Sequence, residues 1–481
     1  MSTARNPFKR RITAGIGIAA LATAALFGSM LPANAADNGN IDTGAAKSLT
    51  IHKYAQPATT GTAPDGNELP ADATSGLTAL KGVEFTIQKV TNIDLNTNAG
   101  WAATVGLSPA DVDGHLGAAQ SKTTGDDGVL TFDGLEQAVY LVTETNPGAN
   151  NVAFAAQPFL VTLPLPDSTK NSWIYNVHVY PKNSLASITK EVNDSAATGL
   201  GDDVTWNIAA KVPNKSADAP LSKFEITDQL DARLTFKSAN VTLESGAAIV
   251  EGTDFTVDGS TGTVKISFTA AGLDKFAADE TVNVALVTTV TTLTGNSGVI
   301  TNDATVFTND KDFTSDKAQT NWGKVIIRKT DSADKSKNLQ GAKFQVYATE
   351  ADAKAGSNPI SVSGETTFTS NENGIATIAG LKATLNGSTT PITYWLVETE
   401  APTGYTVAGD VSAASPKSFT VGTDIDTNID IVVENTQTPP FMLPLTGGSG
   451  TAMFMIGGLG LLAVAGGVAM RKRSTRRTVQ A

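Results

Sequence analysis

The sequence predicts an all-β protein made of three β-sandwich domains in a row, and three observations support this prediction. Short runs of alternating apolar and polar residues recur along the chain, as in 49–54, 177–180 and 325–328. Turn-forming residues interrupt these runs about every ten residues, which is typical of sandwiches. Several sequence signatures also occur twice, in the same order. We expect only short helical pieces, such as 109–119 and 348–355.

The first residues predict a secretory leader. Four basic residues lie within the first eleven positions, the apolar run 12–31 follows, and Ala33-Asn34-Ala35 offers a small-x-small cleavage site. Such a segment is removed on export and takes no part in the fold. We therefore expect residues 1–35 to be a signal peptide.

The last forty residues combine the pentapeptide Leu443-Pro444-Leu445-Thr446-Gly447 with an apolar span at 451–470 and a basic tail at 471–481. The proline favours extended backbone before it, and the glycine allows an enzyme to approach closely. The span is long enough to cross a bilayer, with the tail left in the cytoplasm. This order resembles the sorting signal of Gram-positive surface proteins, which a sortase cuts between Thr and Gly. The alternative is a plain membrane anchor with an accidental pentapeptide.

Charge and composition exclude several classes of function. The leader and the segment after Thr446 carry nine basic residues and no acidic ones, so their removal takes the formal net charge from −12 to −21. A strongly acidic surface argues against nucleic acid and anionic membranes as partners. The chain has no cysteine, which excludes disulfides, thiol catalysis and thiolate metal sites.

No metal site or cofactor is expected from the sequence. His52, His115 and His178 lie far apart along the chain, and we expect each to be an ordinary strand or loop residue. The acidic loops 37–42 and 331–338 lack the spacing of a calcium-binding EF-hand. No nucleophile-elbow pattern is present, so a secreted enzyme anchored to the wall is the weakest alternative.

The repeated signatures indicate that the first and third domains share a fold, because their order is the same and the stretch between them lacks them. The matching pairs are 80–85 with 339–344, 128–135 with 374–381, and 140–145 with 394–399. We predict domains at 36–183, 184–316 and 321–438. A polar linker at 310–320 would join the last two, and a Pro/Thr tether at 436–440 would precede the sorting motif.

The first domain ends in Tyr180-Pro181-Lys182-Asn183. Pro181 cannot donate to a strand ladder and should end the strand, leaving Lys182 exposed at a domain edge with its amine free. The motif resembles the pilin motif of shaft pilins from sortase-assembled Gram-positive pili. By that resemblance, Lys182 attacks Thr446 of another copy, held as a sortase thioester, and forms an isopeptide bond. The alternative is a surface lysine after a strand end.

The third domain carries the run Tyr394-x-Leu396-x-Glu398-Thr399-x-Ala401-Pro402. It resembles the E-box of B-type pilin and collagen-adhesin domains, in which a buried Glu catalyses an internal Lys–Asn bond. The resemblance implies Glu398 as the acid, Lys329 in the first strand as the nucleophile and Asn435 in the last strand as its partner. Burial would make the amine neutral and keep the acid protonated. The alternative for Glu398 is a solvated strand carboxylate.

The middle domain resembles the A-type relative of these domains, in which an Asp takes the place of the Glu. The family order of Lys, Asp and Asn selects Lys190, Asp228 and Asn302. The alternatives left open are Asp231 and Asp303 for the acid and Lys223 for the nucleophile.

The first domain keeps the B-type pattern through Lys53, Glu144 and Asn183. Some shaft pilins close this bond and others do not, so both outcomes stay open. Because Asn183 adjoins Lys182, closing the bond would help to position the polymerising lysine.

The resemblance covers the whole mature chain and implies three immunoglobulin-like domains (B-type, A-type, B-type) of a shaft pilin. Such a chain is a structural subunit of a wall-anchored surface fimbria and not an enzyme. Before the sortase cuts it, the chain would be held in the membrane as an intermediate. The implied partners are other copies of the chain, a pilin-class sortase, a housekeeping sortase with peptidoglycan, tip and base pilins, and a host receptor where the shaft has one. The alternative is a monomeric wall-anchored adhesin or an accessory pilin.

Overall fold

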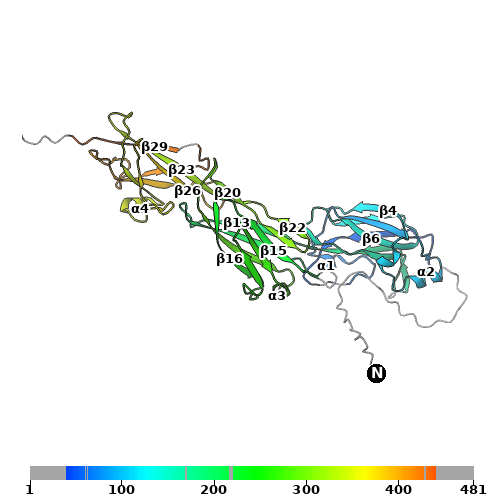
Figure 1. Cartoon of the computed structure of the whole chain (residues 1–481). Helices are drawn as coiled ribbons and strands as arrows, with labels where there is room; N and C mark the ends of the chain where they lie inside the picture. Colours follow the sequence, from blue (N-terminus) through cyan, green and yellow to red (C-terminus); the bar gives the residue numbers. More distant parts are fainter. Residues whose placement is uncertain are drawn as a thin grey trace, which may run out of the picture.

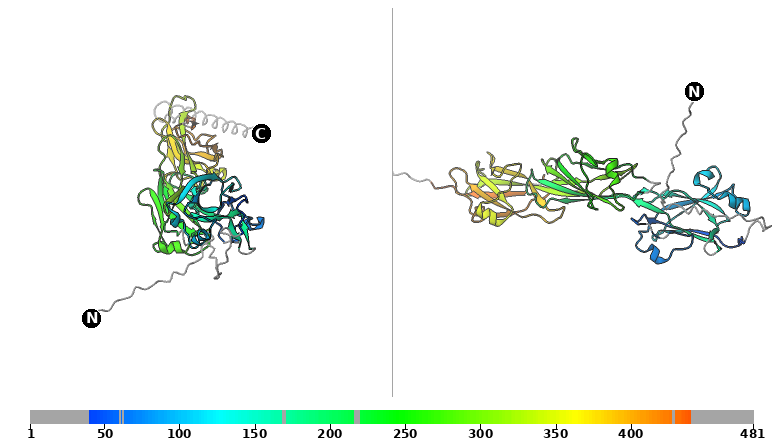
Figure 2. Two further views of the ribbon diagram at one scale, coloured as in Figure 1. Left: turned by 90° about the vertical axis from the view of Figure 1, so that its right-hand side faces the viewer. Right: turned by 90° about the horizontal axis from the view of Figure 1, so that it is seen from below.

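The computed structural model describes residues 40–439 apart from 60, 62, 168–170, 216–219 and 427–428. Three lobes follow one another in chain order along one long axis (Figure 1, Figure 2). Most regular elements are strands and the few helices are short. The predicted all-β, multi-domain fold is therefore confirmed.

Several predicted segments lie outside the described residues: the leader 1–35, the sorting motif with Thr446, the apolar span 451–470 and the basic tail 471–481. Within the part of the chain that is described, no helix combines the length and the apolar character needed to cross a membrane.

The N-terminal lobe packs two sheets around one core. One sheet has the strand order β4-β3-β6-β8 and the other β11-β1-β5. Their strands are β1 (Ser48–His52), β3 (Glu84–Val90), β4 (Leu116–Thr123), β5 (Val129–Phe132), β6 (Ala138–Asn146), β8 (Phe159–Leu163) and β11 (Asn176–Val179). The shorter elements are α1 (Ala71–Thr74), α2 (Asn98–Ala103), η1 (Pro109–Val112), β2 (Tyr54–Ala55), β7 (Val152–Phe154), β9 (Leu165–Asp167), β10 (Ser172–Ile174) and β12 (Lys182–Leu185).

The period-two alternation of the sequence builds this core. Leu49 and Ile51 of β1 point inward together and meet Phe85 and Ile87 of β3 from the facing sheet. Side chains two positions apart share one face of a strand, and in β1 the opposite face is covered as well, since Thr50 and His52 are also buried. β1 lies between β5 and β11 and runs parallel to β11.

The middle lobe is a second sandwich, with sheet orders β13-β14-β19-β16 and β17-β18-β15-β21-β22. Its elements are β13 (Ser187–Asn193), β14 (Asp203–Lys211), β15 (Phe224–Gln229), β16 (Leu234–Leu243), β17 (Phe255–Asp258), β18 (Thr263–Phe268), α3 (Ala270–Asp274), β19 (Thr281–Val290), β21 (Thr305–Thr308) and β22 (Lys311–Thr314). In β19 every second residue is buried, which marks the inward face of the strand.

The C-terminal lobe has one sheet with the order β20-β23-β26, where β29 also pairs with β23, and a second with the order β25-β24-β27-β28. β20 (Val299–Asn302) comes from the middle lobe and pairs with the start of β23. The lobe's own elements are β23 (Ala318–Asp331), β24 (Lys343–Tyr347), α4 (Glu350–Ala355), β25 (Phe368–Thr369), β26 (Ile375–Thr384), β27 (Tyr394–Glu400), β28 (Lys417–Phe419) and β29 (Ile429–Asn435). β23 and β29, the first and last long strands of the lobe, are parallel neighbours.

One expected helix is only a short turn that is followed by a strand. Over 109–119 only the short turn η1 forms, begun by a capping box between Ser108 and Asp111. The chain then turns at Gly114, which has a φ of +78°, and Leu116 starts the edge strand β4. Small residues fit an exposed edge strand as readily as a helix, so the local pattern was ambiguous. The expected helix at 348–355 is present as α4.

The middle and C-terminal lobes are joined by a strand and not by the polar linker expected at 310–320. β23 is a single strand of 14 residues. Its first residues pair with β20 and the rest pair with β26 and β29. Thr320 and Asn321 are polar but buried. One continuous apolar cluster reaches from Trp206 in the middle lobe to Trp322 beyond the joint, whereas the N-terminal lobe has a core of its own.

Candidate functional site

Each lobe buries one lysine, one carboxylic acid and one asparagine side chain from the set predicted by sequence. The three sets are Lys53, Glu144 and Asn183; Lys190, Asp228 and Asn302; and Lys329, Glu398 and Asn435. In each set the acid lies on a strand of the sheet that faces the lysine. The structure therefore brings together residues that lie far apart in sequence.

In the C-terminal lobe the three side chains meet between β23, β27 and β29. Asn435 Nδ2 donates to Glu398 Oε1 at 2.8 Å, and Lys329 Nζ lies 3.9 Å from the same oxygen. Lys329 Nζ also donates to the backbone oxygen of Val433 at 2.8 Å. The backbone N–H of Ala408 donates to Glu398 Oε2 at 2.7 Å. The acid is thus held within reach of both the amine and the amide.

Burial favours the neutral forms in this cluster. Desolvation lowers the pKa of Lys329 to about 8, and the nearby Glu398 only partly opposes this shift. Desolvation also raises the pKa of Glu398, although hydrogen bonds from Ala408 and Asn435 act in the opposite direction. A neutral amine can attack a carbonyl carbon, and a protonated carboxylic acid can donate its proton to the carbonyl oxygen.

The N-terminal lobe repeats these contacts. Lys53 Nζ lies 2.8 Å from Glu144 Oε2, and Asn183 Nδ2 donates to Glu144 Oε1 at 2.6 Å. Lys53 Nζ and the backbone N–H of Ala156 both donate to Asn183 Oδ1, at 2.5 and 2.8 Å. Desolvation lowers the pKa of Lys53 to about 8 against the pull of Glu144. The Ala156 N–H is placed to stabilise the charge that would develop on Oδ1 during attack on this amide.

Strand register explains why these two lobes reproduce one arrangement. Lys329 is opposite Val433 in the parallel pair of β23 and β29, so Asn435 lies two residues further on the same face. In the N-terminal lobe, β1 pairs with β11 and β2 pairs with β12 in one continuing parallel register. Asn183 again lies two residues beyond the position opposite Lys53. The offset between the lysine and the asparagine, two residues across a parallel strand pair, is therefore the same in both lobes.

The middle lobe places its cluster between its two sheets. Lys190 of β13 pairs with Asp228 of β15 and donates to the backbone oxygen of Asp303 at 3.1 Å. Asn302 is buried beside Asp228. Its amide nitrogen and oxygen have no hydrogen-bond partner of normal geometry within the described residues. Desolvation lowers the pKa of Lys190 and raises that of Asp228, in each case against the charge of the partner.

The alternatives in the middle lobe make other contacts. Asp231 is paired with the guanidinium of Arg233 at 2.7 Å. Lys223 is half exposed, and its Nζ lies 3.6 Å from the buried carboxylate of Glu225. Asp303 reaches Lys190 through its backbone oxygen. The side chains that meet are those of the predicted set.

Lys182 does not have the free, exposed amine that was expected after Pro181. β11 ends at Val179, but a new strand, β12, begins at Lys182 itself and pairs in parallel with β2. The lysine is half-buried at the boundary of the N-terminal and middle lobes, and its Nζ donates to the backbone oxygen of Tyr180 at 3.4 Å. Desolvation lowers its pKa. Proline interrupts pairing only locally, because the next residue recovers a donor.

One buried lysine–acid pair was missed by the sequence reasoning. Lys382 Nζ lies 2.7 Å from Asp194 Oδ2, and both side chains are fully buried at the joint of the middle and C-terminal lobes. The hydroxyl of Thr320 donates to the same carboxylate at 2.6 Å, and the backbone N–H of Asn386 at 2.6 Å. Alternation could not have found it, because burial in β26 stops alternating after Ala379 and every residue from Gly380 to Thr384 is buried.

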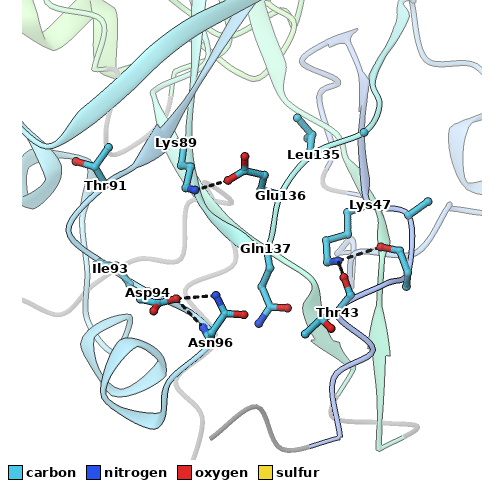
Figure 3. Close-up of a pocket in the computed structure, with 13 residues that line it drawn as sticks. Thr43, Lys47, Lys89, Thr91, Ile93, Asp94, Asn96, Leu135, Glu136 and Gln137 are labelled. Carbon is cyan, nitrogen blue, oxygen red and sulfur yellow. Dashed lines mark hydrogen bonds and ion pairs between the residues drawn. The ribbon is translucent and has the colours of Figure 1, made fainter.

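A polar surface depression of the N-terminal lobe has its charges paired internally. Figure 3 shows Lys89 turned toward Glu136 and Asp94 turned toward Asn96. Another wall is formed by Lys47, whose Nζ donates to nearby backbone oxygens. No residue of the three clusters lines this depression, and we assign it no role.

Comparison with protein families divides the chain into three matches. Residues 44–184 match the N-terminal domain D1 of Gram-positive pilin subunits. Residues 186–321 match the Sgo0707 N2 domain, and residues 323–437 match a prealbumin-like fold domain.

Whole-length relatives agree with these matches. The chain is 33% identical to fimbrial subunit type 1 of Actinomyces viscosus, covering 97% of this chain and 98% of the relative. It is 29% identical to fimbrial subunit type 2 of Actinomyces naeslundii, covering 97% of each. The full-length major pilin SpaD from Corynebacterium diphtheriae has a similar structure, with a TM-score of 0.71 and 27% identity over 83% of this chain and 99% of that one.

Proposed function

Since this chain belongs to the Gram-positive pilins and is a major pilin of that family, we propose that it is a pilus shaft subunit polymerised by a class C sortase. The polymer bond joins Lys182 of one copy to Thr446 of the next. Internal Lys–Asn isopeptide bonds stabilise each subunit. The chain is then a substrate of the sortase, and its own chemistry is limited to forming each internal bond once.

In the polymerisation step, the sortase cuts between Thr446 and Gly447 and keeps the Thr446 carbonyl as a thioester. The neutral amine of Lys182 attacks that carbonyl carbon, the new C–N bond forms, and the C–S bond breaks to release the sortase thiol. Burial of Lys182 supports this role, because a lowered pKa increases the neutral fraction of the amine. The link joins two different surfaces, and such a head-to-tail contact does not close on itself, so it produces a fibre.

In the internal step, the neutral Nζ of the lysine attacks the side-chain carbonyl carbon of the asparagine. The acid first donates its proton and then shuttles a proton to the leaving nitrogen, which departs as ammonia. One C–N bond forms, one breaks, and the acid is restored. The proposed sets pair Lys329 with Asn435 under Glu398, Lys190 with Asn302 under Asp228, and Lys53 with Asn183 under Glu144.

The observation that carries the proposal is the repetition of one geometry. A buried lysine, a buried acid and a buried asparagine meet in every lobe, and desolvation lowers the pKa of all three lysines. Asn302 and Asn435 also bury amide atoms that lack hydrogen-bond partners within the described chain. Such atoms cost about 1–3 kcal/mol each. A reaction that consumes these amides gives a reason for their burial.

Other partners follow from the same proposal. A housekeeping sortase would join the base of the fibre to peptidoglycan, with tip and base pilins at its ends, and a host receptor would bind a shaft that is itself adhesive.

Polymerisation of the chain can be tested directly. Boiled cell-wall extracts are expected to show a ladder of multimers, whereas a chain truncated before Leu443 should be secreted as monomer. A wild-type extract that contains only monomer would instead favour the wall-anchored adhesin.

The internal bonds can be counted by mass. Each bond loses one ammonia, so the intact mature chain should be lighter than its sequence mass by ~17 Da per bond, ~51 Da for three bonds. The variants Lys53→Ala, Lys190→Ala and Lys329→Ala should each recover one such step relative to their own sequence masses. A wild-type mass equal to the sequence mass would contradict the internal bonds and leave the polymer proposal to the ladder test.

A further inference from the structure

Two histidines that are distant in sequence are neighbours in the N-terminal lobe. β1 and β11 run in parallel with Thr50 opposite His178, and His52 follows two residues later on the same face. His52 Nε2 and His178 Nδ1 share a hydrogen bond of 2.9 Å whose donor depends on the tautomer, and a bound cation would replace it. His52 is buried and His178 is partly exposed. Neither histidine belongs to the three clusters.

A carboxylate completes the group. The ligand atoms of His52, His178 and Glu68 all lie within 4.8 Å of one another, and Glu68 is exposed. Its segment is tied to β11 on both sides. The backbone N–H of His178 donates to the oxygen of Gly66 at 2.8 Å, and the N–H of Leu69 donates to the hydroxyl of Tyr180 at 2.7 Å. Glu68 therefore lies between two fixed points.

Gly66 allows the backbone conformation of this segment. Its φ is +96°, and a Cβ at this position would lie 2.2 Å from Leu165 Cδ2. The ring of Tyr180 stacks on the ring of His52 with centroids 4.5 Å apart and an angle of 11° between the planes. Stacking fixes the plane of one imidazole, and the strand pairing fixes the backbone of the other. The donor set is preorganised by the fold.

The spacing suits a small transition cation. Two nitrogens that bind zinc tetrahedrally at about 2.0–2.1 Å lie about 3.3 Å apart, so the imidazole nitrogens need to separate by only a few tenths of an ångström. The exposed carboxylate of Glu68 can turn to supply the third ligand. Imidazole ligands select zinc, copper or nickel over calcium and magnesium. Two histidines and one glutamate leave a fourth position for water.

We propose that His52, His178 and Glu68 form a binding site for a divalent transition cation of the zinc type. The site fastens the 66–69 segment to β1 and β11, the strand that leads to Lys182. It departs from the expectation that each histidine is an ordinary strand residue. A cation bound only by the folded lobe stabilises that lobe by mass action.

The test is a zinc titration of the untagged mature chain, 36–446, followed by calorimetry and thermal unfolding. One zinc per chain and a raised unfolding temperature are expected, with no shift for calcium. His178→Ala should weaken binding by more than about 100-fold, since even outer-shell partners of a metal are worth 10–100-fold. Glu68→Gln should weaken it by about 10-fold or more. Glu68 is exposed, so this second variant should fold like the wild type.

His115 provides the matched control, because it is exposed and lies outside the group. His115→Ala should bind zinc as the wild-type chain does. The proposal is overturned if the wild-type chain shows no saturable zinc binding, or if His115→Ala loses as much affinity as His178→Ala. Unchanged affinity in Glu68→Gln would overturn the three-ligand site.

Discussion

A Lys182→Arg variant is expected to lose the multimer ladder completely and to reach the cell wall as monomer. Arginine keeps the positive charge and nearly the length of the side chain, but it stays protonated and cannot act as a nucleophile. The sortase thioester at Thr446 would then have no amine to accept it within the shaft. Immunoblots of boiled wall extracts measure the result directly.

Lys81→Arg is the control for this experiment. Lys81 belongs to the same lobe, and its exposed side chain lies 3.5 Å from Asp126 at the surface. Its ladder should match that of the wild type. The mass deficit of Lys182→Arg should also stay unchanged, which shows that the neighbouring Lys53–Asn183 bond still closes. A ladder that persists in Lys182→Arg would assign the polymer bond to another lysine.

A Glu398→Gln variant is expected to leave the C-terminal lobe without its internal bond. Glutamine has nearly the same shape, but its amide cannot transfer a proton to the carbonyl oxygen and take one back. Lys329 and Asn435 would therefore remain unlinked. The intact mass should be ~17 Da closer to the sequence mass than in the wild type. The bond closes a loop of about 100 residues, so its loss should lower the free energy of unfolding by about 4–5 kcal/mol, if it acts as a disulfide does.

Glu400→Gln is the matched control, two residues along the same strand. Glu400 is exposed and pairs with Lys343 at 2.7 Å, and an exposed pair contributes about 0–1 kcal/mol. Its mass deficit and unfolding temperature should stay close to those of the wild type. If Glu398→Gln retains the full mass deficit, Glu398 is not the catalytic acid. A digest that links the peptides of Lys329 and Asn435 would locate the bond.

The clusters of the first and third domains could be predicted from sequence because the repeat aligns their strands, whereas the middle set depended on the resemblance to A-type domains. The signatures around Glu144 and Glu398 mark equivalent strands, and a lysine near the start and an asparagine at the end of each repeat then become candidates. In a sandwich whose first and last strands are neighbours, such residues can meet. Periodicity and the repeat located the strands, and the resemblance to pilin domains selected the reacting residues on them.

What failed depended on contacts between distant segments. The stretch before Thr320 is polar and looked like a linker, but Thr320 donates to buried Asp194 from the preceding lobe. Lys182 looked exposed because local sequence does not show that β12 pairs with β2. His52 and His178 looked isolated because their proximity arises from parallel pairing across more than a hundred residues. In each case the local sequence does not show which distant segment the residue contacts.

The position of Lys182 decides which parts of a subunit carry tension in the proposed fibre. Force would enter at Lys182 and leave at Thr446, so it passes through the middle and C-terminal lobes only. The N-terminal lobe lies outside the stretch of chain between these two residues, so its Lys53–Asn183 bond carries none of the pulling force.

Between Lys182 and Thr446, the two internal isopeptide bonds of the middle and C-terminal lobes carry the force past most of the chain. With Lys190 joined to Asn302 and Lys329 joined to Asn435, only 183–189, 303–328 and 436–445 could lengthen under pull. Much of the central stretch belongs to β21, β22 and β23, and the buried Lys382–Asp194 pair braces it at the joint. Such a shaft would hardly lengthen under tension, while the N-terminal lobes of its subunits carry no force.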